Sequence, residues 1–203
     1  MRKKIVVRFF TWYISRIIAN DFSSFTFNKV DVDKSKAILL VANHFSWWDG
    51  FLMYQLNRLV FKKNFHVLVT EENYKNVGFL KYLGAFPVKR KSKSMMESLN
   101  YASGLLDDQK NLVLVFPQGR LFSNHVEEVR FEKGLMYIVN ASQKNFQYLL
   151  SASFVDYFEK RKPSVTCYLR TCNGAEFASI DSIKTAYNNH YETSRNQHSR
   201  LTV

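Results

Sequence analysis

The sequence predicts an α/β domain with a mainly parallel (mixed) sheet flanked by helices. Short apolar and β-branched segments alternate with helical segments along most of the 203 residues, and this alternation is typical of parallel strands joined by helices. Three prolines and seven glycines favour long regular elements. The length suits one main domain, which we expect to cover residues 31–203, preceded by an N-terminal helix and connector at residues 1–30.

The predicted elements follow from hydrophobic periodicity. The clearest strand is 111–116, an uninterrupted Asn-Leu-Val-Leu-Val-Phe run of the kind that is buried on both faces. Other strands are predicted at 36–41, 65–70, 85–88, 147–154 and 164–171. Helices are predicted at 49–59, 73–82, 94–107 and 131–142, and from residue 179 a polar helix fades into a loose tail. In the helix at 94–107 we expect the core-facing residues to be Met96, Leu99, Tyr101, Leu105 and Leu106.

Residues 1–20 predict an amphipathic helix. The segment begins with basic residues, but Arg8 and Arg16 interrupt its apolar run and no small-residue cleavage site follows, which argues against a signal peptide. It is also short and charged for a membrane span. Two interpretations stay open: a helix in a membrane interface, with cations toward phosphates and Trp12 at headgroup depth, or a helix docked on its own core.

Charge and cysteine content narrow the classes of partner. The formal net charge is +12 and the pI is about 9.7, so the partner is expected to be anionic: nucleic acid, an anionic membrane surface, or a phosphorylated or CoA-like substrate. Cys167 and Cys172 are too few for a disulfide framework and are spaced poorly for a metal pair. We expect both to be reduced and structural.

Polar and basic residues follow three of the predicted strands. They are Asn43, His44, Ser46 and Asp49 after the first, Lys89 and Arg90 at the end of the second, and Gln118, Gly119 and Arg120 after the third. Because ligands in open α/β sheets bind at the carboxyl ends of the strands, we expect one shared site. A histidine with a carboxylate nearby suits a general base at neutral pH.

The ordered motifs resemble those of the PlsC-like glycerolipid acyltransferases, the lysophosphatidate type. The Asn-His-x-x-x-x-Asp motif is met by Asn43, His44 and Asp49, and the glycine–hydrophobic strand that ends in Arg by Gly84, Phe86 and Arg90. Phe-Pro-Glu-Gly-Thr-Arg is matched in part by residues 116–120, and residues 131–134 are similar to the Phe-Lys-x-Gly helix start. The fourth block, near residues 149–154, lacks its proline. The resemblance spans about residues 35–172 and implies a glycerolipid-acyltransferase-like fold.

This resemblance implies an O-acyltransferase. A fatty acyl group would move from acyl-CoA or acyl carrier protein to the hydroxyl of a lyso-lipid, in the biosynthesis of phospholipids or related membrane lipids, with no cofactor and no metal. The implied partners are the lyso-lipid acceptor, the acyl donor and an anionic membrane surface, with no nucleic acid. The implied location is peripheral or monotopic, on the cytoplasmic face of the cell membrane.

The resemblance also implies roles for the loop residues. His44 is expected to be the general base, with Asp49 fixing its tautomer and stabilising the imidazolium; the acceptor hydroxyl itself attacks, so no nucleophilic serine is needed. Backbone amides near Gly119, or Asn43, are expected to hold the oxyanion. The remaining substrate-binding residues are expected to be Arg90 and Arg120, with Lys89, for phosphate oxygens, together with Ser46 and Gln118.

The chain departs from the family pattern in its third motif. Gln118 stands where the family has Glu, and the missing threonine places Arg120 one residue early. Because this loop helps to hold the headgroup in the family, the acceptor stays open. It is either lysophosphatidate or another hydroxylated lipid, such as a lyso-aminolipid or a phenolic lipid.

The same residues allow other interpretations. Ser46-Trp47-Trp48-Asp49 is also a capping-box pattern, and Trp47 and Trp48 suit packing or interface positions. A basic binding protein without catalysis, for nucleic acid or an anionic membrane, would not need His44. A serine esterase would need a Gly-x-Ser-x-Gly elbow, which the sequence lacks.

Overall fold

The computed structural model describes residues 2–88 and 93–202, without the side chains of Arg2, Lys3 and Lys93. The described residues form a seven-stranded sheet in the order β1-β7-β6-β2-β5-β3-β4. Its strands are β1 (Ser24–Phe27), β2 (Ala37–Ala42), β3 (Asn64–Thr70), β4 (Ala85–Val88), β5 (Asn111–Val115), β6 (Phe146–Asp156) and β7 (Ser164–Asn173). All pairings are parallel except the antiparallel pair β6–β7. The predicted mainly parallel, mixed sheet is therefore confirmed.

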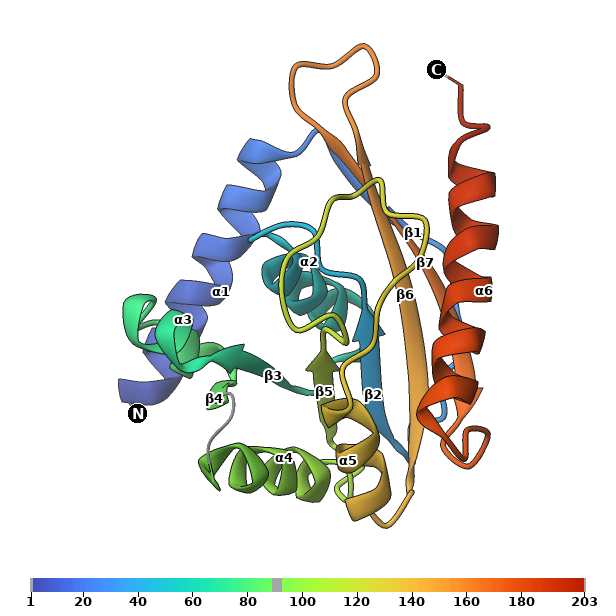
Figure 1. The fold of residues 1–203 in the computed structure, drawn as a ribbon. Helices are drawn as coiled ribbons and strands as arrows, with labels where there is room; N and C mark the ends of the chain where they lie inside the picture. Colours follow the sequence, from blue (N-terminus) through green and yellow to red (C-terminus); the bar gives the residue numbers. More distant parts are fainter. Residues whose placement is uncertain (1, 89–92, 203) are drawn as a thin grey trace.

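Helices cover both faces of this sheet (Figure 1). They are α1 (Arg2–Asp21), α2 (Asp49–Leu56), α3 (Glu71–Asn76), α4 (Lys93–Leu105), α5 (Gly134–Ala141) and α6 (Ile180–His198). Leu39 and Val41 of β2 pack in the core that contains residues of α4, α5 and α6, whereas Ile38 and Leu40 pack in the core that contains residues of α1 and α2. Every residue of β2 and β5 is buried, because a parallel strand between two helical layers has no solvent-facing side.

Several predicted boundaries differ from the structure. The helix predicted at 49–59 is α-helical to Leu56 and continues as a π-helical turn at Asn57–Phe61. The helix predicted at 73–82 is split into α3 and a 3-10 turn at Leu80–Leu83. Finally, α5 begins at Gly134, three residues later than predicted.

Two core assignments in α4 are wrong. Met96 and Tyr101 are 39% and 53% exposed, while Leu99, Ala102 and Leu106 are buried. The buried positions are spaced by three and four residues, so the helix is rotated relative to the prediction. Tyr101 instead contacts Phe86 edge-on at the surface.

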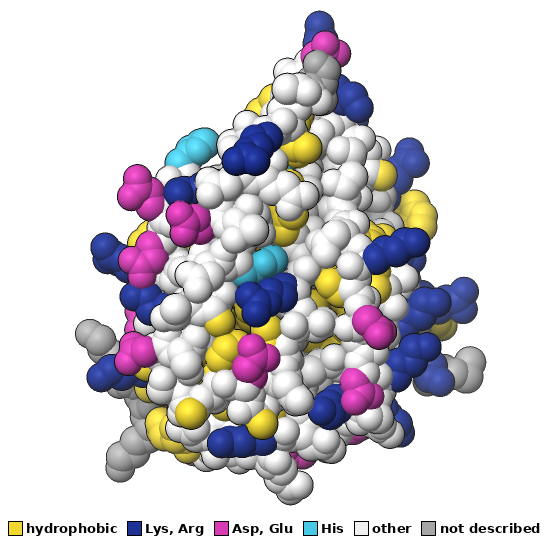
Figure 2. All heavy atoms as spheres, turned by 90° about the vertical axis from the view of Figure 1, so that its right-hand side faces the viewer, with side chains coloured by type: hydrophobic (Ala, Val, Ile, Leu, Met, Phe, Trp, Pro, Cys, Tyr) yellow, Lys and Arg dark blue, Asp and Glu magenta, His cyan; other side chains and the backbone are white. Residues whose placement is uncertain are grey.

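The predicted elements differ most from the structure at the two ends of the chain. The edge strand β1 was not predicted; it pairs with β7, in the register Ser24 with Ser164, about 140 positions away. The C-terminal segment does not fade into a tail, because α6 runs for 19 residues from a capping box formed by Ser179 and Ser182. Basic and acidic side chains are interspersed over the face that bears α6 (Figure 2).

The N-terminal helix α1 is docked on the domain. Ile14 and Ile18 are buried in the core beside α2, and the hydroxyl groups of Thr11 and Tyr54 lie 2.7 Å apart. Its opposite side leaves large apolar side chains in solvent, namely Ile5, Phe9, Trp12 and Tyr13. Among the described residues, none of the helices combines the length and apolar character that a membrane span requires.

Gly84 allows a close approach between β3 and β4, and this gives a first prediction. Its φ is +85°, and a Cβ built there would lie 1.7 Å from the carbonyl oxygen of Phe65. We expect Gly84→Ala to lower the free energy of unfolding by about 3 kcal/mol or more, from backbone strain and steric overlap. Gly104→Ala is the matched control, since nothing lies within 4 Å of its Cβ. Denaturant titration measures both, and equal stability of the two variants would contradict the prediction.

Two half-buried histidines predict loss of stability in acid. Burial lowers the pKa of His190 below 6.5, and Arg170 lowers it further, although the hydrogen bond to the Tyr168 carbonyl opposes the shift. The unfolded chain therefore takes up a proton at a higher pH than the native protein does. The contribution of neutral His190 to the free energy of unfolding is fully present above about pH 6.5. It is lost as pH falls through the pKa of His190 in the native protein. His66 adds to this effect in the same direction.

The measurement is the unfolding midpoint between about pH 7 and about pH 5. We expect the midpoint to fall with pH in the wild type and to fall less steeply in His190→Gln. His125, which is exposed, provides the control substitution His125→Gln, for which the wild-type slope is expected. An unchanged slope in His190→Gln would contradict the assignment.

Candidate active site

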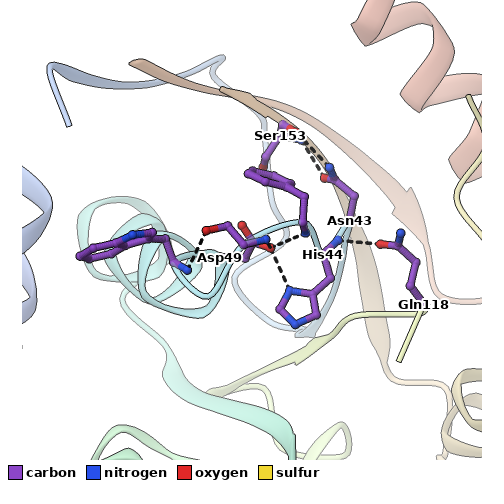
Figure 3. A network of polar contacts seen from close by, with 8 residues as sticks. Asn43, His44, Asp49, Gln118 and Ser153 are labelled. Atoms are coloured by element: carbon purple, nitrogen blue, oxygen red, sulfur yellow. Dashed lines mark hydrogen bonds and ion pairs between the residues drawn. The ribbon is translucent and has the colours of Figure 1, made fainter. Parts of the chain in front are cut away.

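The predicted histidine–aspartate pair is formed. β2 ends at Ala42, and the segment 43–48 that leads into α2, here named the histidine loop, carries His44 outward (Figure 3). His44 Nδ1 lies 2.8 Å from Asp49 Oδ2. The same oxygen accepts the backbone N–H groups of Phe45 and Ser46 at 2.8 and 2.9 Å. One carboxylate oxygen therefore holds both the imidazole ring and the loop that carries it.

Asp49 is 3% exposed. Burial raises the pKa of its carboxyl group, although the hydrogen bonds from His44, Ser46 and Phe45 oppose the shift. Its other oxygen, Oδ1, is buried without a hydrogen-bond partner among the described residues. Among the described residues, the His44 ring and the two loop N–H groups are therefore the hydrogen-bond donors to this buried carboxylate.

Ser46 and Asp49 also begin the helix α2. Ser46 Oγ accepts the N–H of Trp48 at 3.1 Å, and Asp49 accepts the N–H of Ser46 in return. The predicted capping box is formed only in part, because the N-cap residue of α2 is Trp48, which makes no side-chain cap hydrogen bond, and the N–H of Asp49 donates to the Ser46 carbonyl instead of to Oγ. Ser46 does not line the large cavity beside His44. In the structure it shapes the loop, and its contact with substrate stays a prediction.

Asn43 fixes the start of the histidine loop against β6. Its side-chain Nδ2 donates to the carbonyl of Ser153, and its Oδ1 accepts the N–H of Ser153, both at 2.9 Å. The amide therefore extends the β2–β6 pairing by one step beyond Ala42 and Ser151. Because both polar atoms are used and the residue is 4% exposed, the Asn43 side chain positions His44 and does not offer a donor to an oxyanion.

Gln118 holds His44 from the neighbouring strand. The side chain is 3% exposed, and its Oε1 accepts the backbone N–H of His44 at 2.6 Å (Figure 3). The His44 carbonyl in turn accepts the N–H of Phe122, and the Phe116 ring stacks on the imidazole at 4.1 Å. Sequence reasoning missed Phe116, since its contact depends on β2 lying next to β5, and nothing in the local sequence signals that neighbour.

The His44 ring borders a large cavity of about 970 Å³. Its walls are mostly apolar, from residues such as Phe51, Val67, Leu83, Leu99, Leu135 and Ile138. Since Nδ1 faces Asp49, the second ring nitrogen is the one left for chemistry at this cavity. Volume and lining are those of a site for a largely apolar ligand.

Two of the predicted binding residues lie at this cavity. Arg120 and Gly119 both line it, and the Arg120 guanidinium lies 5.1 Å from the centre of the Phe122 ring. However, the N–H of Gly119 donates to the Phe116 carbonyl at 3.1 Å, so that amide closes a turn instead of facing an oxyanion. Lys133 also lines the cavity. The sequence predicts a helix start at this residue but does not predict a role for it in the site.

The predicted Lys89 and Arg90 lie outside the described residues. Val88, the residue before them, lines the cavity. Within the described ranges, the site thus brings together His44, Asp49, Gly119 and Arg120 as predicted, and it gives Asn43, Ser46 and Gln118 positioning tasks behind the histidine. No group of three His, Cys, Asp or Glu side chains suited to a metal ion occurs among residues 2–88 and 93–202.

Comparison with known proteins identifies this arrangement. A family model described as Acyltransferase matches residues 25–152, which is more than half of the chain. The chain belongs to the acyltransferase family. It is therefore an acyltransferase enzyme, and the family predicted from the motifs is confirmed. No protein of curated function matches its sequence.

A solved structure shares the fold. The crystal structure of the 1-acyl-sn-glycerophosphate (LPA) acyltransferase PlsC from Thermotoga maritima superposes with a TM-score of 0.71 at 18% identity. The match covers 99% of this chain and 83% of that one. The acyltransferase domain thus has a PlsC-like architecture, including the N-terminal helix and the mixed sheet.

Proposed function

We propose that the enzyme transfers a fatty acyl group from acyl-CoA or acyl carrier protein to the hydroxyl of a lyso-lipid. The observation that carries this proposal is the His44–Asp49 pair at the mouth of a large, mostly apolar cavity. A cavity of this kind suits an acyl chain, and a histidine held by a carboxylate suits proton removal from an alcohol. In this proposal the reaction requires no cofactor and no metal.

The geometry supports a direct transfer. With Nδ1–H donated to Asp49, the Nε2 atom of His44 carries the lone pair that takes the proton from the acceptor hydroxyl. The hydroxyl oxygen forms a C–O bond with the thioester carbonyl carbon, the C–S bond breaks, and the proton on Nε2 passes to the leaving thiolate. Asp49 stabilises the imidazolium between these steps, and its three hydrogen bonds keep the ring in one orientation.

Recognition of the acceptor falls to Arg120 and Lys133 among the described residues. Both line the cavity, and Arg120 is exposed, as a residue that meets a headgroup must be. Gln118 is buried behind His44, so the family's Glu is replaced at a position that does not face the acceptor here. An anionic headgroup such as lysophosphatidate fits the two cations, and a lyso-aminolipid or phenolic lipid is the alternative acceptor.

A matched acyl-transfer assay separates these acceptors. The purified enzyme would receive a long-chain acyl-CoA, or acyl carrier protein, with either lysophosphatidate or a lyso-aminolipid. We expect the preferred acceptor to depend on Arg120, so that Arg120→Gln raises KM for an anionic acceptor more than for a neutral one. An equal change for both acceptors would show that Arg120 binds the donor instead.

We further propose that the enzyme lies peripherally on the cytoplasmic face of the membrane, where its donors occur. The outer side of α1 supports this location. Phe9 and Trp12 are 54% and 60% exposed, and Arg8 and Arg16 are exposed on the same side. Aromatic and basic residues together on one side of a helix are typical of a helix in the membrane interface.

Removing the imidazole tests the proposed base. We expect His44→Ala to lower kcat about 100- to 10,000-fold, the contribution typical of general acid–base catalysis, with no loss of folding as judged by thermal unfolding. The matched control is His125→Ala, an exposed histidine that does not border the large cavity. If His44→Ala retained full activity, the assignment of His44 as the general base would be wrong.

Gln118 offers a second test of how His44 is held. Gln118→Met leaves the His44 N–H buried without an acceptor, so we expect a loss of about 1–3 kcal/mol in stability and a lower kcat/KM. Gln118→Glu keeps an acceptor and serves as the control. We therefore expect the kcat/KM of Gln118→Glu to stay closer to that of the wild type than the kcat/KM of Gln118→Met does. Identical losses in both variants would indicate that Gln118 contacts substrate instead.

A further inference from the structure

The turn between β6 and β7 extends past the rest of the sheet. Residues 157–163, here named the basic tip, form the loop at the top of Figure 1. Tyr157 and Phe158 are 60% and 42% exposed, and neither is part of the two hydrophobic cores. The tip therefore presents two aromatic side chains to its surroundings without using them for packing in the cores.

Phe158 is also held in an unfavourable backbone conformation. Its φ is +46°, in the left-handed region that a turn normally fills with Gly, Asn or Asp. A hydrogen bond from the N–H of Lys160 to the Tyr157 carbonyl, at 3.0 Å, closes the turn, and the turn holds the Phe158 side chain outside both hydrophobic cores. A bulky aromatic residue in a conformation that suits glycine is a reason to look for a function of its exposed side chain.

The cations of the tip follow directly after the aromatic pair. Lys160, Arg161 and Lys162 are consecutive and exposed, and Glu159 is the one acidic residue of the tip. None of the ion pairs found within residues 2–88 and 93–202 involves these three cations. Figure 2 shows Lys and Arg side chains at this narrow end of the molecule. Exposed aromatics beside unpaired cations match the chemistry of an anionic lipid surface.

The tip is hydrogen-bonded to the connector that follows α1, and it borders a hollow that the histidine loop also lines. The N–H of Ser23, two residues after α1, donates to the Pro163 carbonyl at 2.8 Å, and α1 points toward the tip in Figure 1. On the other side, Tyr157 and Pro163 line a hollow of about 510 Å³ together with Phe45, Ser46 and Trp48. A surface that meets both α1 and the tip would thus lie next to the loop that carries His44.

We propose that the basic tip is a second membrane contact, which binds anionic lipid beside the outer side of α1. This inference rests on the proposed function at a membrane and adds a second element, specific for lipid charge. Two contacts fix the orientation of the enzyme, whereas α1 alone would leave it free to rotate about the helix axis. An acidic protein such as acyl carrier protein would meet the same cations, but it gives no reason for two exposed aromatic rings at a strained turn.

Vesicle binding tests the cations of the tip. The tip variant carries Lys160→Gln, Arg161→Gln and Lys162→Gln. The matched control carries Lys34→Gln, Lys110→Gln and Lys144→Gln, which changes the net charge equally; these residues are exposed and lie before the amino ends of β2, β5 and β6. We expect the tip variant to bind vesicles of equal parts phosphatidylcholine and phosphatidylglycerol about 10- to 100-fold more weakly. The control is expected to bind like the wild type.

Phe158→Gly separates a membrane role from a structural one. Glycine accepts the positive φ at no cost, so we expect an unchanged or higher unfolding midpoint together with weaker vesicle binding, about fivefold or more. A lower midpoint with unchanged vesicle binding would show that Phe158 serves the fold, and would overturn this part of the inference.

Activity toward substrates dispersed in detergent micelles distinguishes failure of this inference from failure of the proposed function. We expect both tip variants to retain wild-type kcat/KM in micelles, because the tip does not line the His44 cavity. Vesicle binding equal to that of the wild type would overturn the inference and leave acyl transfer untouched. Loss of binding to acyl carrier protein, with vesicle binding intact, would overturn it in favour of a protein partner.

Discussion

The site depends on one oxygen atom, Asp49 Oδ2, which accepts three hydrogen bonds. One comes from the ring of His44 and two come from the backbone of the histidine loop. The same oxygen therefore determines both the orientation of the ring and the conformation of the loop, and its position is set by Asp49 at the start of α2. Because that carboxylate is buried, its charge is compensated mainly by these donors. In the proposed mechanism, a base assembled in this way needs no reorganisation when it takes up a proton.

The central strands hold this loop from both sides. Asn43 pairs with the backbone of Ser153 in β6, and Gln118, which follows β5, accepts the N–H of His44. Both contacts exist because β2 lies between β6 and β5 in the sheet. The complete burial of β2 and β5 makes that order rigid, so apolar packing deep in the sheet determines where an imidazole at its edge is located.

Local features could be predicted from the sequence, and contacts between distant segments could not. The strand at 111–116 was evident from its apolar run, and the His44–Asp49 pair from a spacing that one loop can close. By contrast, β1 is a four-residue edge strand whose partner is about 140 residues away, and the partners of Asn43 and Gln118 follow from strand order alone. The same limit applies to the orientation of these two side chains: the sequence assigns both residues to the site, but the strand order decides that they face Ser153 and the N–H of His44.

The buried amide of Gln118 has a consequence for how this enzyme can diversify. Gln118, which supports the imidazole, lies behind it, while Arg120 and Lys133, the residues that we propose meet substrate, line the cavity in front. Changes on the cavity side leave the hydrogen bonds of the base intact. Substrate range can therefore drift, in nature or in directed evolution, through changes on the cavity side that leave the support of His44 intact.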